Sequence, residues 1–218
     1  MIEQILPAQV ASVEAYDDSG AGELFAEERA SLGDAAAKRA AEFATVRTCA
    51  RQALTRLGVP AAAVVRGRGG APHWPEGIVG SMTHCRGYRA AAVAHAVDIV
   101  TIGIDAEIHG PAADGVLPYI ASVDERAQLQ SLSRQDPHVH WDRVLFSAKE
   151  SVYKAWFPLT LRWLDFTEAV VAIDPDRGRF STRLLVTGPT WPGDEPVRFD
   201  GRWLVRDGLV VTAVVIGN

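Results

Sequence analysis

The segment Thr101–Glu107, which reads Thr-Ile-Gly-Ile-Asp-Ala-Glu, alternates apolar residues with small or acidic ones. This period of two is typical of a β-strand that is buried on one face. Because successive side chains of a strand point to opposite faces, we expect Asp105 and Glu107 on one side, with Ile102 and Ile104 in the core on the other. The segment therefore predicts a strand that presents two carboxylates together.

Two interpretations of this acidic pair are open at this point. Carboxylates at positions i and i+2 of a strand can share one hard cation such as Mg²⁺. The pair can equally be two solvated acids at the end of an exposed strand, and the segment by itself favours this second interpretation. The sequence about forty residues further on changes the balance.

A long helix is predicted in that later region. Asp136-Pro137 is typical of a helix start, because an acid caps the first turn and proline suits the first helical position. From there an apolar stripe runs to Pro158, where the helix is expected to end. The opposite side carries a polar stripe at three- and four-residue steps, which consists of His140, Arg143, Ser147, Glu150 and Lys154.

This helix contains two of the three lysines of the chain. Of the 22 basic residues, only Lys38, Lys149 and Lys154 are lysines. Lysine is a compact point charge and arginine a planar fork, so the choice of lysine is either chemical or a matter of chance. Glu150 can form an ion pair with Lys154 four residues later, or it can join the acidic strand as a third carboxylate at a metal. With that strand present, the metal site is the favoured interpretation.

The first part of the chain contains a predicted basic region. A helical pattern covers residues 21–57, includes Arg47, and ends before a Gly-Val-Pro sequence. Residues 66–77 form a loop that is rich in glycine and proline and carries Arg66 and Arg68. Glycines let a backbone approach phosphate closely, but the loop lacks the G-x-G-x-x-G pattern and the Walker lysine. By itself it is a weak signal for phosphate binding.

Strands make up most of the remaining sequence. Apolar or alternating runs predict strands at residues 78–83, 90–94, 100–107, 169–173, 180–186, 197–205 and 209–216. Residues 109–118 contain two glycines and two prolines and indicate a connection. The order helix, strands, connection, helix, strands predicts an α+β fold of two halves, residues 1–108 and 109–218, although no residue-level repeat relates them.

The composition is that of an ordinary globular protein. Hydrophobic residues make up 48% and charged residues 22% of the 218 residues, and the net charge is −5. This charge argues against a nucleic-acid-binding protein. No apolar run reaches the length of a membrane span, the first 18 residues lack the basic region of a secretory signal, and the two cysteines form no disulfide framework. We therefore expect a cytoplasmic protein without nucleic-acid or membrane partners.

Together these segments resemble the 4′-phosphopantetheinyl transferases. The family signature is a strand G-[IV]-D-x-E followed about forty residues later by a helix [FW]-x-x-K-E-[SA]-x-x-K, and Gly103–Glu107 and Phe146–Lys154 match both parts. The upstream segment Gly80–His84 is similar to the family's G-S-x-[ST]-H element. The length and two-part layout resemble the larger, monomeric Sfp-like class. This resemblance implies a pseudo-dimer of two similar α/β halves with the active site in the cleft between them.

The resemblance also implies a reaction. Members transfer 4′-phosphopantetheine from coenzyme A to a serine of an apo acyl or peptidyl carrier protein in fatty-acid, polyketide or nonribosomal peptide synthesis, and they release adenosine 3′,5′-bisphosphate. Mg²⁺ is the expected cofactor, with Mn²⁺ as the alternative ion. Asp105, Glu107 and Glu150 would hold the metal, and Lys149 would neutralise phosphate oxygens. Glu150 would also be the general base, but a carboxylate bound to Mg²⁺ is a poor base, so its role stays open.

Further residues are implied to bind coenzyme A. Arg47 and the loop at 66–72 would surround the adenosine 3′-phosphate, while His84 and its neighbours would contact phosphates. The implied set is Arg47, Arg66, Arg68, Gly70, Pro72, Ser81, Thr83, His84, Lys149 and Lys154. Many relatives have a lysine where this chain has Gly69, and Arg68 is the candidate substitute.

Two other functions are alternatives to the transferase. The same metal site would suit a Mg-dependent hydrolase of nucleotide diphosphates such as coenzyme A, although the phosphohydrolase box with its run of glutamates is missing. A non-catalytic binder of coenzyme A or of carrier protein would keep the fold and lose the activity. The presence of Asp105, Glu107, Lys149 and Glu150 together favours the transferase, because a binder would not need all four charges in one cleft.

Overall fold

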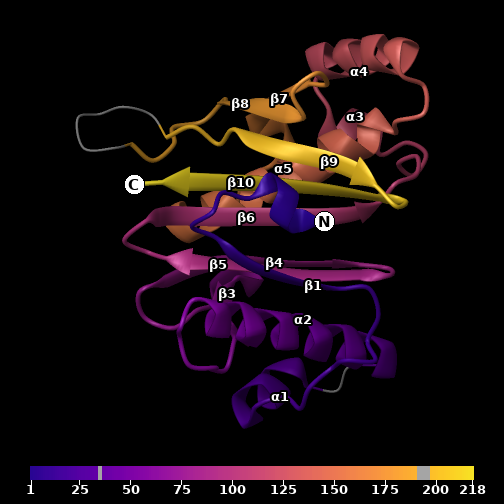
Figure 1. The fold of residues 1–218 in the computed structure, drawn as a ribbon. Coiled ribbons are helices and arrows are strands. Elements are labelled where there is room, and N and C mark those ends of the chain that lie inside the picture. The colour runs from indigo at the N-terminus through magenta and orange to yellow at the C-terminus, as the bar shows by residue number, and fades with distance from the viewer. Residues whose placement is uncertain (34–35, 191–196) are drawn as a thin grey trace.

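The computed structural model describes residues 1–33, 36–190 and 197–218, and its strands form three antiparallel sheets (Figure 1). The smaller main sheet has the order β1 (Ala11–Ala15), β5 (Tyr88–His95), β4 (Ile78–Cys85). The larger has the order β6 (Ile99–Ile108), β10 (Leu209–Gly217), β9 (Gly201–Arg206), β8 (Arg179–Leu184), β7 (Ala169–Asp174). A short ribbon pairs β2 (Val65–Arg66) with β3 (Pro72–His73).

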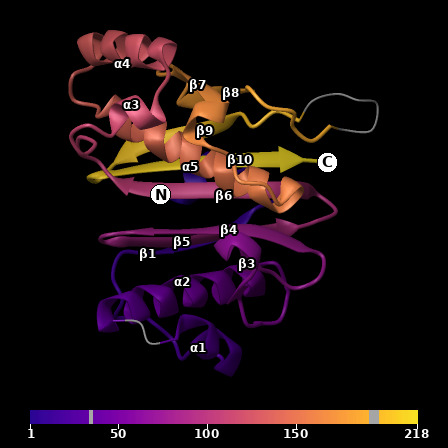
Figure 2. The ribbon, with the colours of Figure 1, turned by 180° about the vertical axis from the view of Figure 1, so that it is seen from behind.

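Each main sheet carries one long helix. The helices are α1 (Ala26–Leu32), α2 (Ala37–Arg56), α3 (Leu117–Ile120), α4 (Val123–Gln135) and α5 (Trp141–Thr160), with short 3₁₀ turns at Ile2–Ile5, Arg68–Gly70 and Phe166–Glu168. Figure 2 shows α5 lying over β6 and β10, and α2 running along the smaller sheet. No helix within the described ranges is both long and apolar enough to cross a membrane.

The structure confirms the expected alternation in β6. Ile102 and Ile104 are buried in a cluster with residues of β5 and β10. Asp105 and Glu107 face the opposite way, and each forms an ion pair with a side chain of α5. Gly103 lies between β6 and α5 at such close range that a Cβ atom there would be 1.9 Å from the Ser151 carbonyl oxygen. The small residue of the motif therefore lets the helix backbone rest on the strand.

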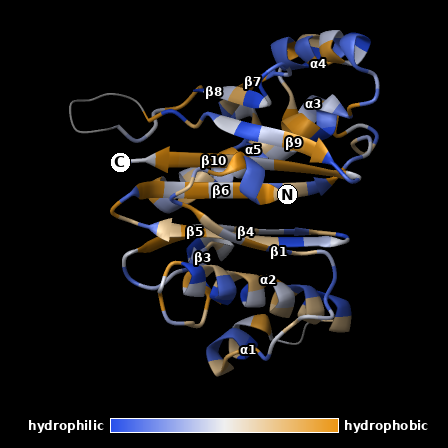
Figure 3. Ribbon diagram, viewed as in Figure 1, coloured by the Kyte–Doolittle hydropathy of each residue, from blue (hydrophilic) through white to orange (hydrophobic). Residues whose placement is uncertain are grey.

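In Figure 3 the central strands β6 and β10 are largely hydrophobic, whereas the outer helix α4 is largely hydrophilic. The apolar face of α5 packs into one core cluster with β7, β8 and β10, and α2 packs into another with β1 and β5. Burial of such apolar surface is the main favourable term in folding. Each long helix is thus held by its own sheet.

The predicted helix at 21–57 was wrong in extent, because the structure divides it. The helix α1 ends at Leu32, the next residue Gly33 has a left-handed φ of 62°, and α2 begins at Ala37. The end of the pattern is confirmed, since α2 stops at Arg56 just before Gly58 at φ 74°. Residues 34–35 of the predicted helix lie outside the described residues.

The predicted helix start at Asp136-Pro137 was also wrong. Asp136 instead terminates α4, and its backbone N–H donates to the Leu132 carbonyl at 2.8 Å. A residue that precedes proline avoids the helical region, and Asp136 is extended at φ −137° and ψ 95°. The helix α5 begins at Trp141 and continues two residues past Pro158 to Thr160.

The same order of elements occurs twice along the chain. In the first part β1 is followed by a short helix, the long helix α2 and further strands, of which the last, β5, pairs with β1. In the second part β6 is followed by α4, α5 and further strands, of which the last, β10, pairs with β6. The boundary expected after residue 108 places β6 in the first half, whereas its hydrogen bonds place it in the larger sheet.

The two main sheets meet where β4 lies beside β6, and side chains make this junction. The backbone N–H of Ile104 donates to the Ser81 hydroxyl at 3.1 Å, and that of Ala106 donates to the Thr83 hydroxyl at 3.0 Å. Both hydroxyl-bearing residues are only 3% exposed. We call this junction the hydroxyl seam. It joins the strand that carries Asp105 to the strand that carries His84.

Side chains of α4 cover the outer edge of the larger sheet. The Glu125 carboxylate accepts the backbone N–H of Val171 at 2.8 Å, and the Gln128 side-chain oxygen accepts that of Ile173 at 3.1 Å. The Gln128 amide also donates to the Ile173 carbonyl at 3.4 Å. The helix therefore satisfies backbone groups of β7 that a neighbouring strand would otherwise pair.

Candidate active site

A cavity of about 980 Å³ opens between α2, the 66–74 loop, β4 and the C-terminal part of α5. Most of the residues that the sequence assigns to coenzyme A line it. These are Arg47, Arg66, Arg68, Gly70, Pro72, Ser81, His84 and Lys154. Thr83 and Lys149, which the sequence places in the same set, lie outside the lining.

A pair of arginines forms one end of the cavity around the Phe43 ring. The Arg47 guanidinium lies 3.4 Å from the ring centroid and that of Arg66 lies 5.4 Å from it. Arg47 donates to the Val64 carbonyl at 3.2 Å, and neither arginine has a carboxylate partner among the described residues. Burial lowers the pKa of Arg47 to about 10, with the charges of Arg66 and Arg51 contributing. This end of the cavity suits an anion.

The glycine-rich loop packs against the end of α5. Gly69 has a φ of 63°, and a Cβ atom there would be 2.3 Å from the Phe157 ring. At this position, where the family resemblance predicts a lysine, the positive φ and the neighbouring Phe157 ring both disfavour a side chain. Arg68 next to it is exposed and lines the cavity, and its role as the substitute for that lysine stays a prediction.

His84 lies at the exposed mouth of the same cavity, at the end of β4. Partial desolvation lowers its pKa, and the charges of Lys154, Arg89 and Arg39 act in the same direction, whereas Glu42 opposes them. The imidazole is therefore neutral at pH 7 in the free protein. Ser81 and Thr83, which precede it, use their hydroxyls in the hydroxyl seam, and their expected contact with phosphate stays a prediction.

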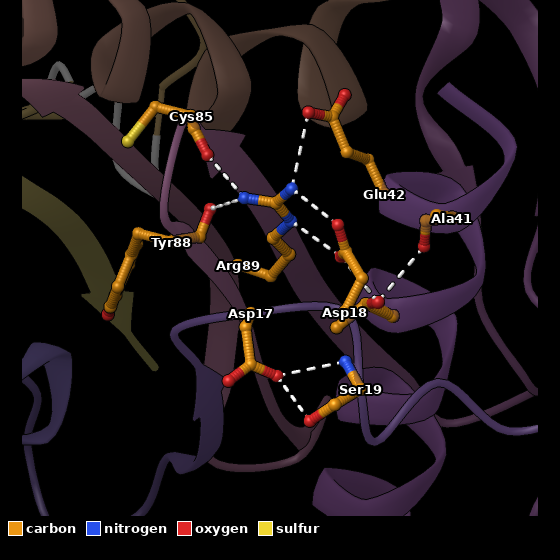
Figure 4. Close-up of polar contacts among 9 residues, drawn as sticks. Asp17, Asp18, Ser19, Ala41, Glu42, Cys85, Tyr88 and Arg89 are labelled. Atoms are coloured by element: carbon orange, nitrogen blue, oxygen red, sulfur yellow. Dashed lines mark hydrogen bonds and ion pairs between the residues drawn. The ribbon is translucent and has the colours of Figure 1, made fainter. Parts of the chain in front are cut away.

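The end of β4 is held in place by a buried arginine (Figure 4). Arg89 is 4% exposed, and its guanidinium donates to both carboxylate oxygens of Asp18, at 3.0 and 2.9 Å, and to Glu42 at 3.2 Å. It also donates to the Cys85 carbonyl at 2.6 Å. Because Glu42 belongs to α2, this network ties the turn after His84 to the helix that carries Arg47.

Asp105, like Glu107 and Glu150, is not among the residues that line the cavity; it contacts the lining through Lys154, and half of its carboxylate is unpaired among the described residues. Its Oδ1 atom accepts hydrogen bonds from Lys154 at 2.8 Å and from the Thr83 hydroxyl at 3.3 Å. Its Oδ2 atom is buried and has no hydrogen-bond partner among the described residues. A buried carboxylate oxygen without a partner is costly, and a bound cation would satisfy it.

Glu107 and Glu150 share the environment of Asp105. Burial raises the pKa of Glu107, the Asp105 charge raises it further, and Arg143 at 3.2 Å opposes the shift. Burial likewise raises the pKa of Glu150, with Asp105 adding to the shift and Lys154 opposing it. The three carboxylates thus form a region of excess negative charge. In the described part of the chain, no group of three or more His, Cys, Asp or Glu side chains lies close enough together to hold a metal ion.

Lys149 is buried away from the cavity, between α5, α4 and the 3₁₀ turn at Phe166–Glu168. Its ammonium forms an ion pair with Glu125 at 2.9 Å and donates to the Phe166 carbonyl at 2.8 Å. It also borders a small hollow of about 50 Å³ beside Glu150, which Tyr153 and Trp163 help to line. The structure therefore does not bring Lys149 together with the arginine end of the cavity.

Sequence reasoning missed several residues that shape this site. Phe43 and Phe157 have no polar signature, and only their contacts with Arg47 and Gly69 reveal their roles. Glu125 did have a signal, because Ser122 and Glu125 form the S-x-x-E capping box that begins α4. That pattern predicts the helix, but it does not predict the lysine partner 24 residues later.

Comparison with known families identifies the superfamily. Residues 27–94 match the family model of the 4′-phosphopantetheinyl transferase N-terminal domain, and residues 101–199 match that of the 4′-phosphopantetheinyl transferase superfamily. The chain belongs to the 4′-phosphopantetheinyl transferase superfamily. The expected family is therefore confirmed, and so is the mixed α/β character of the fold.

Individual members of the superfamily are similar over their whole length. The chain is 52% identical to the 4′-phosphopantetheinyl transferase Svp of Streptomyces mobaraensis over 99% of this chain and 89% of that one. It is 46% identical to Npt of Nocardia iowensis over 98% and 99% of the two chains, and 44% identical to PptT of Mycobacterium tuberculosis over 99% and 98%. Both are also named 4′-phosphopantetheinyl transferases.

Proposed function

We propose that this superfamily member transfers 4′-phosphopantetheine from coenzyme A to a serine of an apo acyl or peptidyl carrier protein and releases adenosine 3′,5′-bisphosphate. One observation carries the proposal. A single cavity is lined at one end by two arginines that have no carboxylate partner among the described residues, and elsewhere by Lys154. Lys154 bonds to Asp105, which lies buried behind the lining and has a carboxylate oxygen without a partner in the described part of the chain. Coenzyme A has a matching distribution of charge, with a 3′-phosphate on the adenosine and a diphosphate further along.

The arginine end would bind the 3′-phosphate. Arg47 and Arg66 are held on the Phe43 ring, so their guanidinium groups are positioned before the ligand arrives. Phosphate accepts paired hydrogen bonds from guanidinium groups, and a desolvated guanidinium binds it more strongly than one in water. His84 and Lys154, which line the same cavity, would contact the diphosphate.

Asp105, Glu107 and Glu150 would hold Mg²⁺, with Mn²⁺ as the alternative ion. The support is the buried, unpartnered Oδ2 atom of Asp105 and the raised pKa values of the two glutamates beside it. When bound, the ion would neutralise charge on the diphosphate and on the leaving group. In its absence Lys154 and Arg143 neutralise Asp105 and Glu107.

The chemical step needs an acceptor for one proton. The serine oxygen attacks the β-phosphorus, the bond from that phosphorus to the bridging oxygen of the α-phosphate breaks, and the serine proton goes to a base. Glu150 is the candidate base, since its raised pKa makes it a better proton acceptor than an ordinary glutamate. The same residue is also a candidate metal ligand.

The repeated order of elements supports two related halves with the site at their junction. Arg47 and His84 come from the first half, and Asp105 and Glu150 come from elements of the second. A substrate with charged groups at two places suits such a junction, because each half of the protein would bind one of these groups. The monomeric state, the cytoplasmic location and the identity of the carrier proteins stay predictions.

One assay tests the proposal against both alternatives. The protein is incubated with Mg²⁺, coenzyme A and an apo carrier protein, and the intact carrier is weighed by mass spectrometry. A mass increase of one phosphopantetheine is expected. Cleaved coenzyme A with unmodified carrier would favour the hydrolase, and no reaction at all would favour the non-catalytic binder.

A variant pair tests the metal assignment. Asp105→Ala should abolish the transfer while the protein stays folded, because it removes the unpartnered oxygen that would bind the ion. Asp176→Ala, which alters an exposed acid far along the chain, serves as the control and should transfer normally. Full activity of Asp105→Ala, or activity of the unaltered protein in EDTA, would refute the metal assignment.

A further inference from the structure

Lys149 belongs to the lysine–glutamate pair of the family signature, yet its surroundings are those of a structural residue. Its side chain is 2% exposed, and its ammonium contacts Glu125 and the Phe166 carbonyl. The Glu125 carboxylate accepts in addition the N–H of Ser122, at the start of α4, and that of Val171, in β7. One buried ion pair thus joins α4, α5, β7 and the turn before β7.

The first half of the chain contains the same arrangement. Glu28, which is fully buried, accepts the N–H of Phe25 at the start of α1 at 3.0 Å and the N–H of Val64 before β2 at 2.9 Å. It forms an ion pair with Arg51 of α2 at 2.7 Å. The glutamate and its cation are 23 residues apart here and 24 apart in the second half. Arg51 is therefore the counterpart of Lys149.

A second pair of contacts repeats five residues further along each long helix. Lys154 donates to the Ile104 carbonyl at 3.0 Å, and Arg56 donates to the Ser12 carbonyl. Ile104 and Ser12 occupy matching places in the two sheets. Ser12 pairs with Ala92, four residues after the start of β5, and Ile104 pairs with Ala213, four residues after the start of β10.

The same register shows which residues differ between the halves. The residue after Ile104 is Asp105, and its counterpart after Ser12 is the apolar Val13. Counted along the strands and the long helices in the same way, the residue of the first half that corresponds to Glu107 is Ala15, and the one that corresponds to Glu150 is Gln52. The first half thus keeps the buried glutamate and its cation while it has none of the three carboxylates. A contact that is present where there is no metal site does not need a phosphate to explain it.

We infer that Lys149 is a positioning residue, which pairs with Glu125 to hold α4, the Phe166 turn and β7 against α5, and that it does not contact the phosphates of coenzyme A. Through the Phe166 carbonyl it fixes the segment 163–166, which lines the hollow beside Glu150. Of the two signature lysines, Lys154 is the one that meets the cavity. The kinetic part of this inference rests on the proposed function, whereas the part that concerns folding does not.

The folding part is tested by a double-mutant cycle on thermal unfolding of the full chain. Lys149→Met should lower the melting temperature by about 10 °C, because it leaves the Glu125 carboxylate buried without its cation. In the Glu125→Gln background, Lys149→Met should lower the melting temperature far less. The difference between the two decreases measures the coupling between Lys149 and Glu125. Lys149→Gln, which keeps a hydrogen-bond donor, should lower the melting temperature less than Lys149→Met does. Independent, additive effects of the two substitutions would overturn the inference.

The ligand part is tested by binding of coenzyme A without Mg²⁺ or carrier protein. Lys149→Gln should change the dissociation constant by less than about two-fold, whereas loss of a charged phosphate contact would weaken binding by roughly ten-fold or more. In the transfer assay the same variant should lower kcat and leave the KM for coenzyme A unchanged. Lys149→Arg should restore kcat, since arginine fills the matching place at residue 51.

A matched control comes from the other half of the chain. Arg51→Gln removes the counterpart of Lys149 and should destabilise the protein to a similar extent, but without a fall in kcat for the folded fraction. If Lys149→Gln binds coenzyme A ten-fold more weakly and has an unchanged melting temperature, the inference is overturned, and Lys149 contacts the phosphates. If the unaltered protein shows no transfer, the proposed function fails, and the unfolding cycle still decides the role of Lys149.

Discussion

A buried guanidinium without a carboxylate partner is costly, and among the described residues Arg47 has no such partner. It is 7% exposed, and burial lowers its pKa to about 10. Loss of a charged contact with the 3′-phosphate should cost about 2 kcal/mol, which is roughly 30-fold in the dissociation constant. Arg47→Ala should therefore weaken coenzyme A about 30-fold and dephospho-coenzyme A far less, as measured by calorimetry. Equal losses for the two ligands would contradict the contact, and Arg134→Ala on α4 is the control.

His84 predicts a pH dependence of coenzyme A binding. Its pKa lies below the ordinary value of 6.5 in the free protein, chiefly through desolvation. An anion beside the ring favours the charged form, so ligand binding raises this pKa. Affinity should then strengthen as pH falls through the interval between the bound and the free pKa, and level off below the free value. His84→Gln should remove this part of the pH dependence in the same titration, and an unchanged profile would contradict the contact.

For single residues, the sequence predicted the direction of a side chain where that direction is set by the residue's own strand or helix. The alternation in Thr101–Glu107 correctly placed Asp105 and Glu107 on one face. It could not reveal that Lys149 turns toward Glu125, because that pairing depends on how two helices pack. Nor could it reveal Phe157 above Gly69, since the contact joins residues 88 positions apart that share no pattern.

Among the elements, the contact between β6 and α5 is the most sensitive to a small change. A methyl group at residue 103 would meet the backbone of Ser151 at 1.9 Å and that of Ala155 at 2.6 Å. Gly103→Ala should therefore destabilise the protein by at least about 2 kcal/mol, because backbone atoms cannot move aside as a side chain can. Urea unfolding measures the loss. Gly110→Ala, at a site with open space, is the control, and equal stabilities would contradict the tight packing.

The elements themselves were predicted unevenly. The last two predicted strands, at 197–205 and 209–216, do form a hairpin, and Asp207 and Gly208 in its turn take positive φ values. The start of α5 was misplaced because Asp136-Pro137 resembles a helix start when read alone, whereas the structure uses Asp136 to end α4. The helix α4 was not predicted, although the capping box of Ser122 and Glu125 is a sequence signal for its start.

For the molecule as a whole, the hydroxyl seam is the joint between the two sheets. Thr83→Val would leave the N–H of Ala106 without its acceptor, at a cost of about 1–3 kcal/mol. The amides of Ile104 and Ala106 should then exchange with solvent faster than those of β10, because the two sheets separate more readily along this line. Native-state hydrogen exchange measures this. In Thr83→Ser, which keeps the hydroxyl, these amides should exchange as in the unaltered protein. If the amides of Ile104 and Ala106 stay protected in both variants, the hydroxyl seam does not join the sheets in this way.

The mixed α/β character of the fold was foreseen from the order of helices and strands, and the family resemblance is confirmed. The side-by-side placement of the sheets was not foreseen, because β4 and β6 meet through hydroxyl groups rather than through a backbone ladder. The assignment of β6 to the larger sheet was missed for a similar reason. Its partner β10 lies about a hundred residues later in the chain, and no local sequence pattern predicts a pairing between such distant segments.

The covering of β7 by Glu125 and Gln128 affects how copies of this protein meet one another. An open strand edge offers unpaired N–H and C=O groups to any extended segment that collides with it, and this is a common route to aggregation. Here the side chains of α4 already occupy the N–H groups of Val171 and Ile173. Growth of the sheet from one molecule into the next is therefore blocked on this side, even when the protein is concentrated.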